Sequence, residues 1–357
     1  MQNRDIWVDY ARGIGIILVV YGHVSRGIFN AGMPMDATLF SLIDSIIYSF
    51  HMPLFFFLSG LFFVPSLQKY GQSGLIAEKT DSVMYPYVLW SLLQGFTEVA
   101  LSHYTTAKTS IPEVLSLLWQ PRAQFWFLYA LFVVMLFVVM LFGSVMFRVQ
   151  RQLSAWKILL PAMVLWASQF WLDWPFPFNF LANYLIFFLL GTQFHLLRSI
   201  IEKRALLASL ISLLAFIAVE YLFHGTLGLR YSDKSFWQAL PAIFGILMVC
   251  SVSCLLAQKR LLLIPSQVYW LALLGSCSMP IFLIHILTGS GSRIVLSKLL
   301  HVHNASLHII AGMLAGLLLP VLIQKLSEQS GWRRLRYLFT PPPFLSMKKR
   351  WLASSAK

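Results

Sequence analysis

Residues 7–25 read WVDYARGIGIILVVYGHVS, an apolar segment long enough to cross a membrane as a helix. The segment carries two ionisable side chains, Arg12 and His23. Eleven helical steps separate them, which corresponds to ~16 Å of rise and leaves them only ~20° apart around the helix axis. Because ionisable groups inside a membrane are costly, a helix face with a guanidinium at one end and an imidazole at the other predicts a functional site.

The composition predicts an all-α, polytopic integral membrane protein. Of the 357 residues, 58% are hydrophobic and only 11% are charged, whereas soluble domains average about 25% charged residues. The net charge of +14 comes from basic residues in short loops and near the C-terminus, so a nucleic-acid partner is not expected. The three cysteines lie in apolar segments, which is typical of buried thiols.

About ten membrane spans are predicted, with the N-terminus in the cytoplasm. They are Ile6–Val24, Leu39–Val64, Val83–Leu101, Phe125–Phe147, Ile158–Leu172, Leu181–Leu197, Leu206–Phe223, Phe236–Leu256, Val268–Thr288 and Leu307–Leu326. The fifth and sixth flank the turn Trp174-Pro-Phe-Pro-Phe178 and are predicted to form a short hairpin. With this arrangement most lysines and arginines fall in the cytoplasm, as the positive-inside rule requires, and both termini are cytoplasmic.

The same topology divides the chain into a transmembrane domain, residues 1–328, and a basic cytoplasmic tail, residues 329–357, beside anionic lipid. The first span has no small-residue cleavage site after it, so it is expected to remain as an anchor.

Further polar side chains fall inside or at the ends of the predicted spans. Asp9 lies three residues before Arg12 and can pair with it. His51 lies near the middle of the second span, before Pro53. The residues predicted towards the outside are His23, Asp44, Tyr48, Glu98, Glu220 and His285. Each alone is typical of a membrane boundary; together they predict a polar cavity that opens outward, with Arg12 and Lys79 at its inner approach.

No zinc spacing, His-Glu-x-x-His motif or glycine-rich phosphate loop is present, so no metal site is expected.

Several of these segments form motifs. The first is Asp9-Tyr-Ala-Arg-Gly-Ile14 running to Tyr21-Gly-His23, the second Phe50-His-Met-Pro-Leu-Phe-Phe-Phe-Leu-Ser-Gly60. Weaker ones are Tyr85-Pro-Tyr-Val-Leu-Trp90, Phe125-Trp-Phe-Leu-Tyr129 and Pro280-Ile-Phe-Leu-Ile-His285. In these motifs the chain resembles membrane-bound acyltransferase family 3, in particular the fucose 4-O-acetylase-like branch that acetylates bacterial surface sugars. One departure is the approach to the third helix, where the family often has several basic residues and this chain has only Lys79.

The resemblance implies a bacterial inner-membrane O-acetyltransferase that moves an acetyl group from cytoplasmic acetyl-CoA to a sugar hydroxyl of an exopolysaccharide, an O-antigen or a lipid-linked repeat unit. His23 would act as general base or carry the acetyl group, alternatives that the residues leave open. Arg12, oriented by Asp9, and Lys79 would hold the donor. His51 and His285 would support catalysis, and Asp44, Tyr48, Glu98 and Glu220 would lie on the acceptor side. No permanently bound cofactor is expected, and the acyl group could be succinyl or longer.

Two other classes of protein remain open. Intramembrane Arg, His and Glu residues also mark the ion pathways of proton- or solute-coupled transporters. Such transporters often contain internal repeats, and none is detected in this sequence. A sensor or scaffold that uses these residues only to bind partners is the third alternative.

Overall fold

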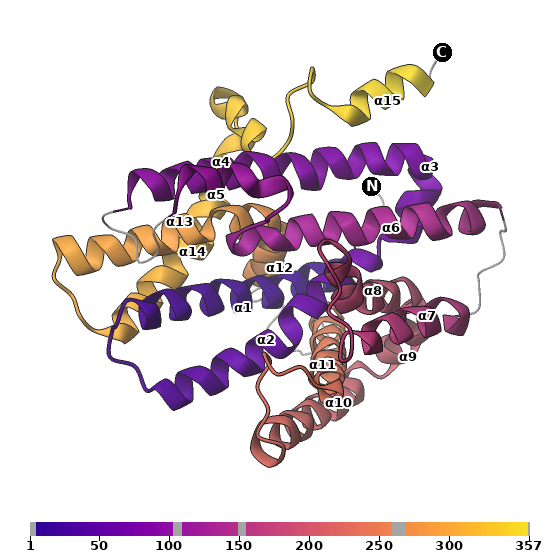
Figure 1. Ribbon diagram of the computed structural model, residues 1–357, viewed down its shortest axis with the longest axis horizontal. Coiled ribbons are helices and arrows are strands. Elements are labelled where there is room, and N and C mark those ends of the chain that lie inside the picture. Colours follow the sequence, from indigo (N-terminus) through magenta and orange to yellow (C-terminus); the bar gives the residue numbers. More distant parts are fainter. Residues whose placement is uncertain (1–4, 103–108, 149–154, 259–268, 356–357) are drawn as a thin grey trace. The chain divides into compact units, whose positions relative to one another are not determined.

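The computed structural model describes residues 5–102, 109–148, 155–258 and 269–355, which form helices and no strand (Figure 1). The chain divides into two compact units. The first contains Met1–Leu58 and Gln193–Leu322, and the second contains Ser59–Thr192 and Ile323–Lys357. The all-α prediction is confirmed. The C-terminal residues belong to the second unit, and the predicted boundary between a transmembrane domain and a tail at residue 328 stays a prediction.

The first unit is built from the N-terminal helices and those that follow residue 193. Its elements are α1 (Ile6–Asn30), α2 (Ala37–Gly60), α9 (His195–Lys203), α10 (Ala205–Glu220), η4 (Tyr221–Thr226), η5 (Phe236–Gln238), α11 (Ala239–Ala257), α12 (Tyr269–Ser276), α13 (Ser278–Ile294), η6 (Val295–Leu299) and α14 (Ala305–Glu328), of which α2 and α14 continue into the second unit. Helices α11, α12 and α13 pack against α1, which is therefore the central helix of this unit.

The second unit holds the middle of the chain and its end. Its elements are α3 (Phe63–Lys79), η1 (Thr80–Met84), α4 (Tyr85–Ala100), α5 (Ile111–Leu115), η2 (Ser116–Leu118), η3 (Ala123–Phe125), α6 (Trp126–Arg148), α7 (Ala155–Ser168), α8 (Phe178–Gln193), η7 (Ser330–Leu338) and α15 (Met347–Ser355). The predicted turn at Trp174–Phe178 lies between α7 and α8, as the sequence indicates.

The long apolar helices make the protein a multi-pass membrane protein. Among the described residues, seven helices are long and apolar enough to cross a membrane, or eight if the bent pair α8–α9 counts as one span. Three of the ten predicted spans correspond to the shorter helices α4, α7 and α8, which have 16, 14 and 16 residues, so the count of ten stays a prediction. Many large apolar side chains of α10 and α14 are exposed, which suits surfaces that face lipid.

Helix α1 is longer than the sequence predicts, because it continues past Val24 to Asn30. Arg26, which lies beyond the predicted first span Ile6–Val24, is therefore part of the helix, three residues after His23. Helix α2 passes through Pro53 without a break in its helical assignment. The continuation of α1 places Arg26 one helical turn after His23.

Helix α12 crosses α1 at very short range because both helices carry glycine at the crossing. A Cβ atom at Gly275 would lie 1.7 Å from the backbone oxygen of Asp9, and one at Gly13 would lie 2.2 Å from that of Leu271. Small residues permit this approach of two backbones, the usual solution for helix pairs in membranes. The crossing fixes the end of α1 that carries Asp9 and Arg12.

The residues after α14 are folded against the second unit. The Asp81 carboxylate accepts hydrogen bonds from the Ser346 hydroxyl at 2.5 Å and from the backbone N–H groups of Met347 at 2.8 Å and Lys348 at 3.2 Å. The Trp90 indole donates to the backbone oxygen of Leu338 at 2.7 Å. The predicted tail is therefore held in place in this structure; its cytoplasmic location stays a prediction.

Candidate functional site

Two of the predicted histidines, His23 of α1 and His285 of α13, face each other in the first unit. Their ring centroids are 5.1 Å apart and the rings are inclined by 53°. Helices α1 and α13 are in contact, although about 260 positions separate the two histidines in the chain. The structure thus brings together the two imidazoles that the sequence places near the same side of the membrane.

The hydrogen bonds of His285 determine which ring nitrogen carries its proton. Nδ1 lies 2.8 Å from the backbone oxygen of Phe282 and 3.0 Å from that of Ile281. Carbonyl oxygens can only accept, so Nδ1 carries the proton and Nε2 keeps its lone pair. Nε2 is buried and has no hydrogen-bond partner among the described residues. His285 therefore presents a free, neutral base beside His23.

His51 of α2 is arranged in the same way. Its Nδ1 donates to the backbone oxygen of Ile47 at 2.8 Å, which leaves a lone pair on Nε2. The ring is almost completely buried and meets the Tyr48 ring edge-on, with 4.4 Å between centroids. The first unit thus contains two neutral imidazoles whose acceptor nitrogen is set by the backbone.

Arg26 is a further charged residue near His23 that the predicted site does not include. Its guanidinium binds the Asp44 carboxylate through two hydrogen bonds of 2.7 and 2.8 Å, and donates another of 2.7 Å to the Tyr231 hydroxyl. It also lies 3.4 Å from the centroid of the Tyr48 ring. The predicted acceptor-side residues Asp44 and Tyr48 are therefore in contact with one cation. The signal that could have located Arg26 is its spacing, because i and i+3 share a helix face.

Arg12 and Asp9 lie near the other end of α1. Arg12 is half-buried and Asp9 is buried. Helix α1 is unbroken from Ile6 to Asn30, so the predicted separation of ~16 Å between Arg12 and His23 applies. The two residues are near opposite ends of one rigid helix.

Glu220, another acceptor-side candidate, lies at the end of α10 beside α2. Its Oε1 accepts a hydrogen bond of 2.9 Å from the Ser49 hydroxyl, and its Oε2 lies 2.9 Å from His224 Nε2. Both side chains are more than 90% buried. Glu220 therefore contacts α2 through Ser49, two residues before His51, and its second carboxylate oxygen faces the His224 ring.

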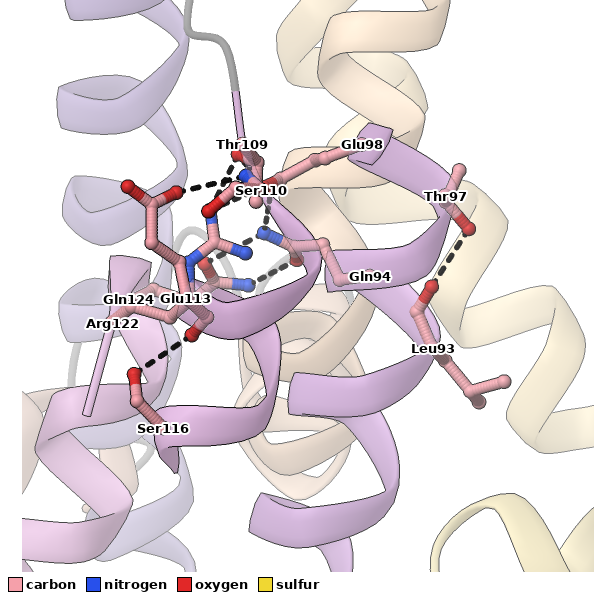
Figure 2. Close-up of polar contacts among 10 residues, drawn as sticks. All are labelled: Leu93, Gln94, Thr97, Glu98, Thr109, Ser110, Glu113, Ser116, Arg122 and Gln124. Carbon is pink, nitrogen blue, oxygen red and sulfur yellow. Dashed lines mark hydrogen bonds and ion pairs between the residues drawn. The ribbon is translucent and has the colours of Figure 1, made fainter. Parts of the chain in front are cut away.

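Glu98 and Lys79 belong to the second unit and are described within it. Figure 2 shows Glu98 at the centre of a polar network between α4 and the segment that precedes α6. Arg122 donates to Glu98 at 2.6 Å and to the Thr109 hydroxyl at 2.8 Å, and Gln94 donates to Glu98 at 2.8 Å. The amide of Gln124 donates to that of Gln94 at 2.7 Å (Figure 2).

This network gives Glu98 a structural function in the second unit, because the carboxylate holds the segment around Arg122 against α4. Lys79 is paired with the adjacent Glu78 at 3.1 Å. The roles predicted for Glu98 in acceptor binding and for Lys79 in donor binding stay predictions. Among the described residues, no group of three or more His, Cys, Asp and Glu side chains is placed to hold a metal ion.

Comparisons with known proteins agree with the resemblance in the motifs. A family model described as an acyltransferase domain, Acyl_transf_3, matches residues 5–325. The nodulation protein NolL of Mesorhizobium japonicum is 29% identical over 132 residues, and NolL of Sinorhizobium fredii is 28% identical over 130 residues. These matches cover 37% and 36% of this chain, and 34% of each relative. The chain thus spans about a third of the length of the curated relatives it matches.

No solved structure matches the chain. The family model, in contrast, covers nearly all of it and includes α1, α2 and α13, the helices that carry the three histidines. The chain belongs to the acyltransferase 3 family of membrane proteins.

Proposed function

We propose that this protein transfers an acetyl group from cytoplasmic acetyl-CoA to a sugar hydroxyl of a polysaccharide outside the bacterial cytoplasmic membrane. The observation that supports it best is the pair of facing imidazoles, His23 and His285, on helices of an acyltransferase-family chain. Acyl transfer to a hydroxyl needs a group that removes the hydroxyl proton as the oxygen attacks. A neutral imidazole does this well at pH 7, typically accelerating the reaction 10²–10⁴-fold.

In the direct form of the reaction, the sugar oxygen attacks the acetyl carbonyl carbon and its proton passes to His23. The carbon–sulfur bond then breaks, and the CoA thiolate takes the proton. In the two-step form, a His23 nitrogen attacks the carbonyl carbon, the carbon–sulfur bond breaks, and the CoA thiolate takes the proton of the other ring nitrogen. The sugar oxygen then attacks the acetyl carbon, the carbon–nitrogen bond breaks, and the hydroxyl proton passes to the imidazole. His285 Nε2 and His51 Nε2 are hydrogen-bond acceptors suited to orient the attacking hydroxyl or the protonated His23 ring.

The donor side of the proposal assigns Arg12, with Asp9 and Lys79, to the phosphates or carbonyl oxygens of acetyl-CoA. A guanidinium forms short, charge-assisted hydrogen bonds with such groups. Arg12 lies ~16 Å along α1 from His23, about half of the ~30 Å hydrocarbon layer that separates donor and acceptor compartments. A path along one face of α1 would connect them.

The test uses purified protein in detergent with labelled acetyl-CoA and a hydroxyl acceptor. Wild-type protein is expected to release CoA and label the acceptor, and His23→Ala is expected to abolish both. A label that stays on the protein in the absence of acceptor, and disappears with His23→Ala, would identify the two-step form. In cells, surface glycan without the protein or with His23→Ala should lack the mass of the acetyl group.

A proton- or solute-coupled transporter is the second candidate, and the Glu220–His224 pair favours it. These two buried ionisable groups lie 2.9 Å apart within a membrane-spanning segment, the kind of pair found in proton pathways. Solute flux in proteoliposomes that depends on Glu220, without any release of CoA, would replace the acetyltransferase proposal with this one.

A further inference from the structure

The hydroxyl group of Tyr48 is buried without a hydrogen-bond partner among the described residues. Buried hydroxyl groups are almost always hydrogen-bonded, because an unpaired one loses its bonds to water without replacement. An unpaired hydroxyl beside a cluster of imidazoles is therefore a feature to be explained. A hydroxyl group that forms its hydrogen bond with the substrate during the reaction would be unpaired in the absence of substrate.

The ring of Tyr48 is held on three sides. A Cβ atom at Gly22 would lie 2.9 Å from its Cε2 and 3.3 Å from its Oη, so this glycine makes room for the phenol directly before His23. Arg26 covers the ring at 3.4 Å, and the edge of His51 contacts it. The hydroxyl is thereby fixed beside the turn of α1 that carries His23.

Arg26 packs on the Tyr48 ring, and two of its three guanidinium nitrogens are bound to other side chains. Its Nε and one of its terminal nitrogens are occupied by Asp44 and Tyr231. Its positive charge nevertheless lies against the phenol ring, and a nearby cation stabilises negative charge on the phenol oxygen.

The chemistry of acyl transfer requires a donor of this kind. In their neutral forms the His51 and His285 rings can only accept through Nε2, so these imidazoles provide bases, and the carbonyl oxygen needs a donor from another side chain. As the attacking oxygen bonds to the carbonyl carbon, the C=O electron pair moves onto the oxygen. A preorganised donor at that oxygen stabilises the charge until the C–S bond breaks and the carbonyl re-forms.

We propose that Tyr48 is a catalytic residue whose hydroxyl donates a hydrogen bond to the acyl carbonyl oxygen as it becomes negatively charged, and that Arg26 and Asp44 are positioning residues that hold its ring. Tyr48 keeps its own proton throughout, while the proton of the acceptor hydroxyl passes to an imidazole. This inference rests on the proposed acyl transfer.

The test compares kcat and KM of purified wild-type protein and Tyr48→Phe in the acetyl-CoA assay. Phenylalanine keeps the ring, its packing on Gly22 and its contact with Arg26, and removes only the donor. We expect kcat to fall ~10²–10³-fold, the usual effect of removing one oxyanion donor, with KM for acetyl-CoA and the unfolding midpoint unchanged. The matched control is Tyr221→Phe, because the side chain of Tyr221 is 74% exposed in the same unit, and its kcat should equal that of wild type.

A double-mutant cycle tests the positioning residues. Arg26→Gln combined with Asp44→Asn removes both charges together, so that neither is left unpaired. If the pair acts through the Tyr48 hydroxyl, adding Tyr48→Phe to it causes little further loss of kcat, whereas independent structural roles would make the losses multiply.

A wild-type kcat for Tyr48→Phe, in a protein that loses activity with His23→Ala, would overturn the inference and leave the acetyltransferase proposal standing. Wild-type protein that transfers no acetyl group would refute both. If Tyr48→Phe does not fold, 3,5-difluorotyrosine at position 48 keeps the hydroxyl and makes it more acidic. A change in kcat then supports the donor role, and an unchanged kcat contradicts it.

Discussion

Ala123 adopts a left-handed backbone conformation, with φ of +47°, although it is not glycine. It lies between Arg122 and Gln124, whose side chains bind Glu98 and Gln94 in the network of Figure 2. A non-glycine residue in this region carries strain of order 1–3 kcal/mol, which persists only where its surroundings hold it. The hydrogen bonds on both sides of Ala123 provide that restraint and fix the entry into α6.

Replacing Ala123 with glycine is expected to stabilise the protein. The change relieves the left-handed strain, while the greater freedom of glycine in the unfolded chain offsets ~0.5–1 kcal/mol, so the net gain is about 1 kcal/mol. The unfolding midpoint in detergent measures it. Ala218→Gly, an exposed site in α10, is the control and should lower the midpoint. A lower midpoint for Ala123→Gly as well would show that the strain is absent.

At the scale of single residues, the sequence predicts the site only where spacing along one helix defines it. Arg12 and His23 share a face of α1 because of their separation alone. The apolar run stops near Val24, so the sequence predicts the end of the helix there and gives no local sign that Arg26 belongs to it. Its partner Tyr231 lies 205 positions away, a contact that only tertiary packing creates.

At the scale of elements, the crossing of α1 and α12 depends on backbone contact at two glycines. The separation of 1.7 Å between a Cβ at Gly275 and the Asp9 oxygen leaves no room for any side chain. Because the obstacle is backbone, a rotamer change cannot relieve it. This packing also explains why the predicted ninth span is interrupted after Ser276. Helix α12 lies against α1 and ends there, and α13 begins as a separate helix at Ser278.

Gly275→Ala is therefore expected to force α12 away from α1. Overpacking of this kind costs typically 1–3 kcal/mol or more, so the unfolding midpoint should fall clearly and activity should fall with it. Gly291→Ala in α13 is the matched control, because nothing lies within 4 Å of its Cβ position. If both variants unfold at the wild-type midpoint, the close crossing does not exist in the membrane.

The C-terminal helix α15 depends on a residue far from it in sequence. Asp81 accepts the backbone N–H groups of Met347 and Lys348, which are unsatisfied at any helix N-terminus. The sequence predicts only a basic tail here, because the capping residue lies 266 positions away from Met347.

Asp81→Ala should release this helix while the rest of the protein stays folded. Loss of a cap costs typically ~1 kcal/mol. The indole of Trp351 still donates to the Ser73 hydroxyl at 3.1 Å, so the expected effect is more frequent opening of this short terminal helix. Limited trypsin digestion followed by mass spectrometry should then show faster cleavage at Lys348, Lys349 and Arg350. Asp36→Ala, which removes an exposed carboxylate in the other unit, should leave the digestion pattern unchanged. Equal cleavage in wild type and Asp81→Ala would contradict the capping role.

At the scale of the whole molecule, the number of spans decides which side each loop faces. The seven long helices alone would place the two termini on opposite sides. However, η1 continues directly into α4, and together they are ~31 Å long, enough for one more crossing. Helices α7 and α8 then add either two crossings or none. Composition and charge predict an all-α membrane fold with an even number of spans. The lengths of α7 and α8 do not decide whether these two helices cross the membrane.

The contacts of the α7–α8 turn favour a full crossing by this hairpin. The Phe176 ring stacks on Tyr129 with 5.5 Å between centroids, and Phe180 lies beside Trp126. Both Trp126 and Tyr129 belong to the first turn of α6, which the predicted topology places at the outer surface. Aromatic residues at such a turn are typical of a membrane interface. The turn therefore reaches the outer end of α6, and we expect ten spans.

A cysteine at Trp171 tests this topology, because that side chain is 73% exposed next to the turn. The three native cysteines, all buried, are first replaced by alanine. In intact cells a membrane-impermeant maleimide should label Trp171→Cys, whereas Lys69→Cys, predicted to be cytoplasmic, should be labelled only after permeabilisation. Labelling of Trp171→Cys only after permeabilisation would mean that the hairpin returns to the cytoplasmic side. Trp126 and Tyr129, which pack on the hairpin turn, would then lie at the cytoplasmic surface. Each helix before α6 would have to cross the membrane in the direction opposite to the predicted one.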